Sequence, residues 1–236
     1  MKGVLLLGGN GTRLAPLTNI CNKHMLPVGG KPMTQWNVEK LVNVGIKDIL
    51  VISGTHHIGS IIEYFGSGDK FGCNLTYKVQ DEAGGIAEAL KLVEGFIPDE
   101  DPFIVILGDN IFEDDLSDFK FTFEKSDFIN VALTSTKVKD PQRFGVFQDG
   151  GIVEKPNIPK SDEIVAGVYG YRYNNLFKEK LGELEYSSRG ELEITDLNNS
   201  LIYYSGFGFI RHELKGYWTD AGTHESLKKA SELVST

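Results

Sequence analysis

Short apolar runs alternate with helix-length patterns through the first half of the chain, and this alternation limits the possible folds more than any other feature. Strands are expected at residues 4–7, 48–53, 75–79 and 103–107, with helices between them at 34–44, 58–65 and 86–94. Strands that alternate with helices form right-handed βαβ units, in which helices cover both faces of a mainly parallel sheet. The sequence therefore predicts an α/β fold.

The second half of the chain has a different pattern. Strands are expected near residues 130–136, 145–148 and 164–172, and helices near 174–181, 193–204 and 224–234. No linker rich in proline, glycine or serine separates the halves, and no internal repeat is visible. We interpret residues 1–236 as a single domain with an inserted substrate-binding portion.

The charge and the cysteines exclude several classes of protein. With 24 lysines and arginines against 33 aspartates and glutamates, the formal net charge is −9, which argues against binding to nucleic acid or to an anionic membrane. No apolar stretch approaches the length of a membrane span, and the N-terminus does not resemble a signal peptide. Cys21 and Cys73 lie far apart in the sequence, which favours two reduced thiols over a disulfide bond. We expect a cytoplasmic protein.

A glycine-rich segment follows the first predicted strand. It contains Gly8, Gly9 and Gly11, and the basic residues Arg13 and Lys23 come soon after them. Glycines at such a junction let backbone N–H groups approach phosphate oxygens. The spacing does not fit a Walker A loop, and a leucine stands where a dinucleotide fingerprint needs its third glycine. The segment therefore predicts a phosphate-binding loop of another kind.

The run GGNGTRLAPLTNICNKHMLPVGGKP resembles the signature of the sugar-phosphate nucleotidylyltransferases. The later segments QDEAGGIAEA, GDN, RGELEITD and WTDAGT narrow the resemblance to the glucose-1-phosphate thymidylyltransferases of that family. The resemblance implies a Rossmann-like three-layer αβα nucleotidyltransferase fold with an inserted sugar-binding portion. Its nucleotide-binding part would be about 1–110, its sugar-binding part about 111–223, and its last helix about 224–234.

The reaction that the resemblance implies joins dTTP and glucose 1-phosphate to give dTDP-glucose and pyrophosphate, with Mg²⁺ as cofactor, in the supply of dTDP-deoxysugars such as rhamnose. Because this reaction brings two polyanions together, positioning and electrostatics are its main catalytic terms. The site needs cations for the phosphates and carboxylates for the metal. Asp109, which follows a buried strand, and Asp220 are the expected magnesium ligands.

The other site residues are carried over from the resemblance in three groups. Arg13, Lys23 and Asp109 are expected to be catalytic. The nucleotide is expected to contact Gly8, Gly9, Gly11, Thr12, Arg13, Lys23, Gln80, Gly85 and Asp109. The sugar phosphate is expected to contact Gly145, Glu154, Lys155, Val165, Gly167 and Arg189.

Three residues depart from the family pattern. Leu7 replaces a small residue before the glycines, Ala83 replaces a proline in the base loop, and Phe144 replaces a tyrosine beside the sugar site. Gln80 suits the imide edge of thymine or uracil but cannot sense the thymine methyl group through hydrogen bonds. Two alternatives remain open: an enzyme that uses UTP or another hexose 1-phosphate, and a catalytically silent homologue that binds nucleotide sugars.

The resemblance also bears on assembly and regulation. Family members commonly form dimers or tetramers, so we expect a homo-oligomer. Only a short tail, residues 224–236, follows the WTDAGT segment, whereas many members continue through a longer helical extension that contributes to a regulatory site. We expect a form without that extension, in which product-like inhibitors bind only at the active site.

Overall fold

The computed structural model describes residues 1–235, and the chain divides into two compact units that interleave along the sequence. The N-terminal unit comprises residues 2–83, 106–117 and the segment from 216 onward. The middle unit comprises residues 84–105 and 118–215. Strand β6 (Pro102–Leu107) and helix α4 (Ser117–Glu124) each contribute residues to both units.

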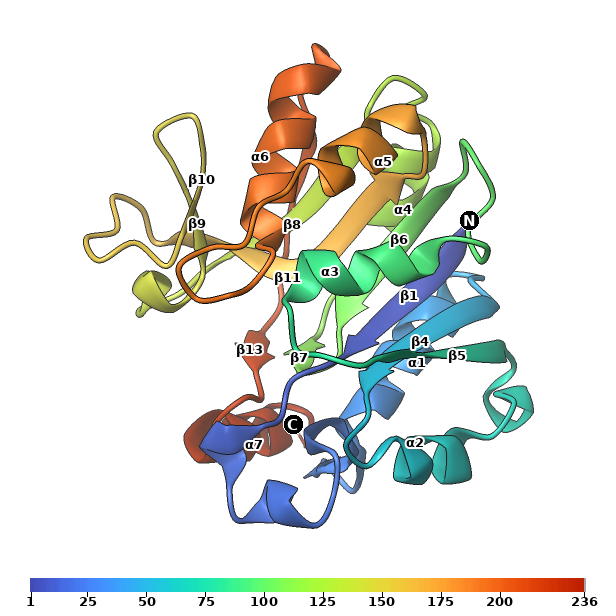
Figure 1. The fold of residues 1–236 in the computed structure, drawn as a ribbon. Coiled ribbons are helices and arrows are strands. Elements are labelled where there is room, and N and C mark those ends of the chain that lie inside the picture. The colour runs from blue at the N-terminus through green and yellow to red at the C-terminus, as the bar shows by residue number, and fades with distance from the viewer. Residues whose placement is uncertain (236) are drawn as a thin grey trace. The chain divides into compact units, whose positions relative to one another are not determined.

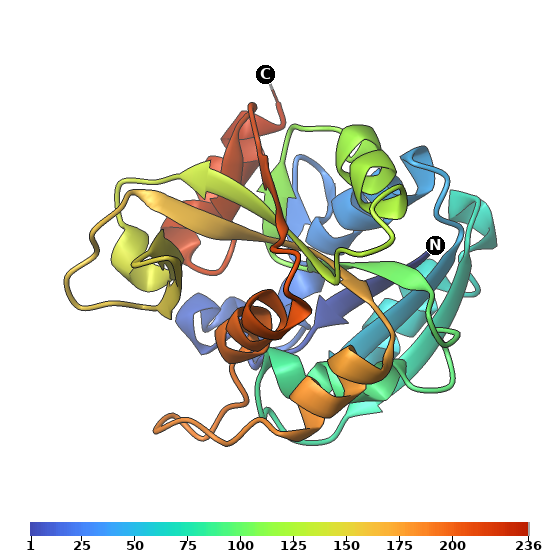
Figure 2. The same cartoon turned by 90° about the horizontal axis from the view of Figure 1, so that it is seen from above.

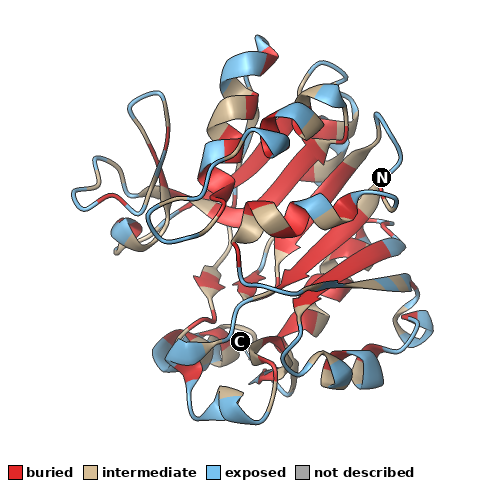
Figure 3. Cartoon of the chain, in the orientation of Figure 1, coloured by how far each residue is buried: buried red, intermediate tan, exposed pale blue. Residues whose placement is uncertain are grey.

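The N-terminal unit is built on three parallel strands. They are β1 (Lys2–Leu7), β4 (Asp48–Gly54) and β5 (Asn74–Gln80), with β4 in the middle, and Figure 2 shows them side by side. The apolar runs of β1 and β4 are almost wholly buried, whereas β5 alternates between exposed and half-buried residues (Figure 3). Continuous apolar runs are typical of strands covered on both faces, and alternation is typical of an edge strand.

Helices and short elements complete this unit (Figure 1). The helices are α1 (Met33–Asn43), α2 (Ile58–Phe65) and α7 (His224–Leu233). Two small antiparallel ribbons pair β2 (Pro27–Val28) with β3 (Lys31–Pro32) and β7 (Asn110–Phe112) with β13 (Trp218–Asp220). Single turns of 3₁₀ helix lie at Thr12–Leu14, Leu17–Asn19, Lys23–Met25 and Asp69–Phe71.

The middle unit is largely antiparallel. Its strands are β8 (Val131–Lys137), β9 (Gly145–Gln148), β10 (Gly151–Glu154), β11 (Glu163–Arg172) and β12 (Ile210–Glu213). Strand β11 pairs antiparallel with β8 and β9, and its register against β8 shifts between Val165 and Tyr169. Gly167 lies within this irregularity with φ +70°, a backbone conformation that glycine adopts without steric cost.

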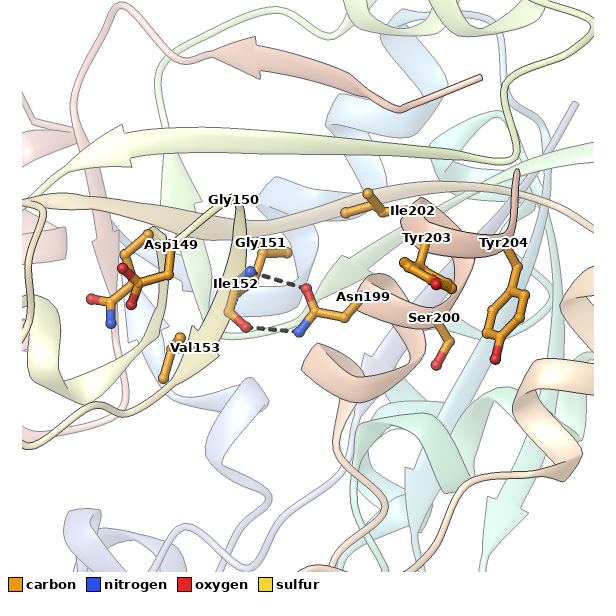
Figure 4. Close-up of a pocket in the computed structure, with 11 residues that line it drawn as sticks. Asp149, Gly150, Gly151, Ile152, Val153, Asn199, Ser200, Ile202, Tyr203 and Tyr204 are labelled. Atoms are coloured by element: carbon orange, nitrogen blue, oxygen red, sulfur yellow. Dashed lines mark hydrogen bonds between the residues drawn. The ribbon is translucent and has the colours of Figure 1, made fainter. Parts of the chain in front are cut away.

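The helices of the middle unit are α3 (Ile86–Leu90), α4, α5 (Asn175–Gly182) and α6 (Ile194–Ser205), with 3₁₀ turns at Lys91–Val93 and Pro141–Arg143. Helix α6 holds the β9–β10 hairpin through Asn199. Its amide accepts a hydrogen bond from the Ile152 N–H (3.0 Å) and donates one to the Ile152 carbonyl (2.7 Å), as Figure 4 shows. A cavity of about 520 Å³ lies between this hairpin and the exposed Tyr203 and Tyr204 of the helix.

The predicted α/β class is confirmed, and the predicted strands and helices agree with the observed ones to within a few residues. Helix α4 and the strands β2, β3, β7, β10 and β12 were not predicted from the sequence, because they are short and only partly apolar. Cys21 and Cys73 are both free thiols, as expected. Among residues 1–235, no helix is both long enough and apolar enough to cross a bilayer.

Candidate active site

The glycine loop of the N-terminal unit leaves its backbone open at the end of β1. Gly9 and Gly11 have φ values of +89° and +62°, so the sequence places glycine where a side chain would strain the turn. The Thr18 hydroxyl donates a hydrogen bond to the Gly11 carbonyl (2.9 Å) and closes the loop. A Cβ atom at Gly8 would lie 3.3 Å from Gln80 Oε1, which places the predicted base-reading side chain beside the loop.

Lys23 lies between this loop and Asp109. Its Nζ is 2.7 Å from Asp109 Oδ2, and a Cβ at Gly9 would lie 3.8 Å from the same ammonium. Burial acts to raise the pKa of Asp109. The Lys23 charge, assisted by His24 and by hydrogen bonds from Lys23 and the Asp109 amide, outweighs burial and lowers that pKa to about 2. Asp109 is therefore ionised at neutral pH, as a metal ligand must be.

His24 follows Lys23 in the same 3₁₀ turn, and its side chain is buried. The side chain is 1% exposed, and burial together with the Lys23 charge lowers its pKa to about 3, although Asp109 acts in the opposite direction. The ring is therefore neutral at pH 7. Asn22 Oδ1 accepts the His24 backbone N–H and lies 2.9 Å from His24 Nδ1, so Nδ1 carries the ring proton.

The two predicted metal ligands meet at Gly222. Strand β13 pairs with β7 so that Asp220 lies opposite Asn110, and the Ala221 N–H donates to the Asp109 carbonyl (2.7 Å). A Cβ at Gly222 would lie 3.6 Å from Asp220 Oδ2, 3.8 Å from Asp109 Oδ2 and 3.4 Å from Arg13 Nη2. Two carboxylates and a guanidinium thus face the space beside Gly222, which a Cβ atom would partly fill.

The chemistry of this donor set fits a magnesium ion. Within residues 1–235 no group of three or more histidine, cysteine or acidic side chains could enclose a metal. Mg²⁺ usually binds one or two carboxylates and completes its shell with water and substrate phosphates. Asp109 and Asp220 supply that number of carboxylates.

Gly108 allows Asp109 to occupy its position. A Cβ there would press on Leu7, lie 2.7 Å from His24 Cδ2 and approach the Leu6 carbonyl. Gly108→Ala is therefore expected to lower the free energy of unfolding by about 1–3 kcal/mol through overpacking. Chemical denaturation measures the change. Gly59→Ala is the control, because Gly59 lies in helix α2 with nothing within 4 Å, and an equal loss in that variant would contradict the explanation.

The middle unit brings together most of the residues predicted for the sugar phosphate. Arg189 Nη2 lies 2.7 Å from Glu193 Oε2 and 3.3 Å from Glu154 Oε1. Lys155 Nζ lies 3.3 Å from the same Glu154 oxygen, and Thr195 donates to Glu154 Oε2 (2.6 Å). These side chains form a charged cluster at the end of the β9–β10 hairpin.

The remaining predicted residues border this cluster or lie in the same unit. A Cβ at Gly145 would lie 3.2 Å from Thr195 Oγ1 and 3.6 Å from Glu154 Oε2. Gly85 has φ +105°, and a Cβ there would lie 2.5 Å from the Leu192 carbonyl, so the predicted base loop packs against the segment that follows Arg189. Val165 and Gly167 lie at the irregularity of β11.

Comparison with known proteins identifies the family of this chain. The nucleotidyl transferase family model matches residues 2–236. The chain belongs to the nucleotidyl transferase family. A curated member, the glucose-1-phosphate thymidylyltransferase of Neisseria meningitidis, is 39% identical over 245 residues, a match that covers 100% of this chain and 83% of the relative.

Two solved structures have the same fold as this chain. A Bacillus anthracis protein, a candidate glucose-1-phosphate thymidylyltransferase solved with sucrose, is 45% identical, with a TM-score of 0.89 over 99% of this chain and 94% of its own. A UDP-glucose pyrophosphorylase complexed with UDP-glucose is 24% identical, with a TM-score of 0.84 over 99% of this chain and 98% of its own. The second likeness establishes the Rossmann-like fold alone.

Two residues of the charged cluster, Glu193 and Thr195, were not predicted from the sequence. Both lie in the RGELEITD segment, from which only Arg189 was assigned a role. The signal was an acidic residue close to Arg189 in the sequence, because Glu193 follows it by four positions. It was ambiguous because Glu191 is equally acidic and closer in sequence.

Proposed function

We propose that this chain transfers a thymidylyl group from dTTP to glucose 1-phosphate, forming dTDP-glucose and pyrophosphate. The observation that carries the proposal is the convergence of Asp109, Asp220 and Arg13 around Gly222, with Lys23 paired to Asp109 beside the glycine loop. Membership of the nucleotidyl transferase family and the 39% identity to a curated thymidylyltransferase support it.

The chemistry needs no strong general base, because the attacking oxygen of the sugar phosphate is already an anion. That oxygen forms a bond to the α-phosphorus of the triphosphate. The bond from the α-phosphorus to the bridging oxygen breaks, and its electron pair leaves with pyrophosphate. Catalysis then depends on holding the two anions in line and on stabilising the charge that develops on the phosphoryl oxygens.

We propose that the N-terminal unit binds the triphosphate. The open backbone at Gly8, Gly9 and Gly11 donates hydrogen bonds, and Thr12 and Arg13 follow at the start of a 3₁₀ turn. Lys23 neutralises charge on the α-phosphate. Asp109 and Asp220 would hold Mg²⁺, which supplies positive charge to the phosphate oxygens when bound.

We propose that Gln80 recognises the base through hydrogen bonds. Gly85 has no side chain, so the backbone there could approach the base closely. The amide of Gln80 can both donate and accept, as the imide edge of thymine or uracil requires. Its Oε1 lies beside Gly8, at the point where β1 enters the glycine loop. The same hydrogen bonds would form with uracil, so UTP is the nearest competing nucleotide.

We propose that the charged cluster of the middle unit binds the sugar phosphate. Arg189 and Lys155 provide the positive charge for the phosphate, and a guanidinium can contact two phosphate oxygens at once. Glu154 would accept hydrogen bonds from sugar hydroxyls. Gly145, Val165 and Gly167 would line the sugar.

Measuring pyrophosphate release with every pairing of dTTP, UTP, glucose 1-phosphate and other hexose 1-phosphates tests the proposal. The expected result is the highest kcat/KM with dTTP and glucose 1-phosphate, and a strict requirement for a divalent cation. A higher kcat/KM with UTP would transfer the assignment to a uridylyltransferase. Tight binding of nucleotide sugars without turnover in any pairing would instead identify a silent homologue.

A further inference from the structure

The guanidinium of Arg189 is held from one side by Glu193. Arg189 Nε lies 3.1 Å from Glu193 Oε1 and Nη2 lies 2.7 Å from Glu193 Oε2, so both carboxylate oxygens contact the same edge of the guanidinium. Nη1 makes neither of these bonds. The contact to Glu154 is of another kind, because it joins a single pair of atoms at 3.3 Å.

Glu193 is more buried than Arg189 and lies next to a firmly bonded backbone. The exposure of Glu193 is 8%, and it stands at the N-cap position of helix α6, where a negative charge is favourable, although its side chain makes no capping hydrogen bond. The preceding Leu192 is bonded on both sides, donating to the Gly84 carbonyl (2.7 Å) and accepting from the Ala87 N–H (3.3 Å). The Arg189 side chain lies in a loop and is 38% exposed.

A third group orients the carboxylate. The Ser187 hydroxyl donates to Glu193 Oε1 (2.7 Å), and the Ser187 N–H donates to the Glu191 carbonyl (2.9 Å), which closes the loop that carries Arg189. Burial acts to raise the pKa of Glu193, but Arg189 and Ser187 outweigh it and lower that pKa. Glu193 is therefore a charged, oriented acceptor before any substrate arrives.

The two carboxylates that accept hydrogen bonds from Arg189 differ in what binding a phosphate would do to them. Glu154 is shared among Arg189, Lys155 and Thr195, and its contact to Arg189 is long. A phosphate dianion can replace that single contact at little cost. The two-point contact with Glu193 lies on the Nε edge, so it can persist while the remaining guanidinium N–H groups bind the phosphate.

We propose that Glu193 is a positioning residue for the sugar phosphate, which it never contacts: it holds the guanidinium of Arg189 by Nε and Nη2 so that the remaining donors meet the phosphate. This inference rests on the proposed function, in which Arg189 binds the sugar phosphate. Without Glu193, Arg189 would have to be ordered by the substrate itself, and this ordering would lower the affinity for the sugar phosphate.

Glu193→Gln tests the inference, because an amide keeps the size of the side chain but presents a donor to one guanidinium nitrogen. We expect KM for glucose 1-phosphate to rise about tenfold, the effect of one lost charge-assisted hydrogen bond, while KM for dTTP stays within about twofold. Glu191→Gln is the matched control. Glu191 lies 3.7 Å from Arg189 Nη2 and forms no hydrogen bond with it, so both KM values should stay unchanged.

A double-mutant cycle separates positioning from general structural damage. In an Arg189→Ala background, Glu193→Gln should change KM for glucose 1-phosphate by less than about twofold, because nothing remains to be positioned. Ser187→Ala, which removes the other hydrogen bond to Glu193, should raise the same KM in the same direction but by less. This second variant keeps the inference testable if Glu193→Gln does not fold.

The outcomes distinguish this inference from the proposed function. An unchanged KM for glucose 1-phosphate in Glu193→Gln, with a raised value in Arg189→Ala, would overturn the positioning role alone. Equal rises in the KM values for both substrates would overturn it as well, because they would indicate a structural defect. An unchanged KM for glucose 1-phosphate in Arg189→Ala would remove Arg189 from the sugar-phosphate site and the positioning role with it. No turnover by the wild-type chain would overturn the proposed function itself.

Discussion

Asp109→Asn is expected to lower kcat by about 10²- to 10³-fold or more while the chain stays folded. Asparagine has nearly the same size and can still accept a hydrogen bond from Lys23, but it carries no negative charge for a metal ion. In the wild-type chain this carboxylate is fully ionised, with its pKa near 2, and it shares the volume above Gly222 with Asp220. The variant therefore loses charge at the position where two anionic substrates need a cation.

Two measurements separate this effect from misfolding. Calorimetric binding of Mn²⁺ with dTTP should weaken in Asp109→Asn, and chemical denaturation should show a stability loss of only about 1–2 kcal/mol, because the ion pair with Lys23 is partly exposed. Asp118→Asn is the control, since Asp118 is exposed in the first turn of α4. Wild-type turnover in Asp109→Asn would remove Asp109 from the metal site.

The regular pattern of the sequence was enough to predict the fold class and the positions of the main strands and helices. Runs such as 103–107 are apolar at every position, and helix α2 begins and ends where its amphipathic pattern does. Asp109 could be placed at the end of a buried strand for the same reason. Short strands such as β10 and β12 carry so few apolar residues that their sequences cannot be distinguished from those of loops.

Pairings between distant segments could not be derived from the pattern alone. The register that places Asp220 opposite Asn110 depends on the pairing of β13 with β7, two strands of three residues each that lie far apart in the chain. The ion pair of Lys23 with Asp109 spans 86 positions. Resemblance to a family suggested these residues, but only the folded chain shows which charged side chains contact one another. The role of Glu193 was inferred from those contacts.

Lys23→Met is expected to weaken dTTP binding by about 10- to 100-fold and to lower kcat as well. The ammonium lies beside both Gly9 and Asp109, so it can contact a phosphate held by the glycine loop and also balance the half-buried carboxylate. Its removal has a second effect. Burial acts to raise the pKa of Asp109, and Lys23 is the largest influence opposing it, so the remaining carboxylate becomes harder to keep ionised.

Calorimetry with dTTP and steady-state kinetics measure the two effects, and Lys47→Met, at an exposed lysine of the same unit, should change neither. Because Lys23 and Asp109 act as a pair, the loss in the double variant Lys23→Met/Asp109→Asn should be smaller than the product of the two single losses. Independent losses would mean that Lys23 serves only the phosphate. If the loss in the double variant is little more than that of Asp109→Asn alone, the main role of Lys23 is to keep Asp109 charged for the metal. The cycle therefore decides which of the two functions of this lysine dominates.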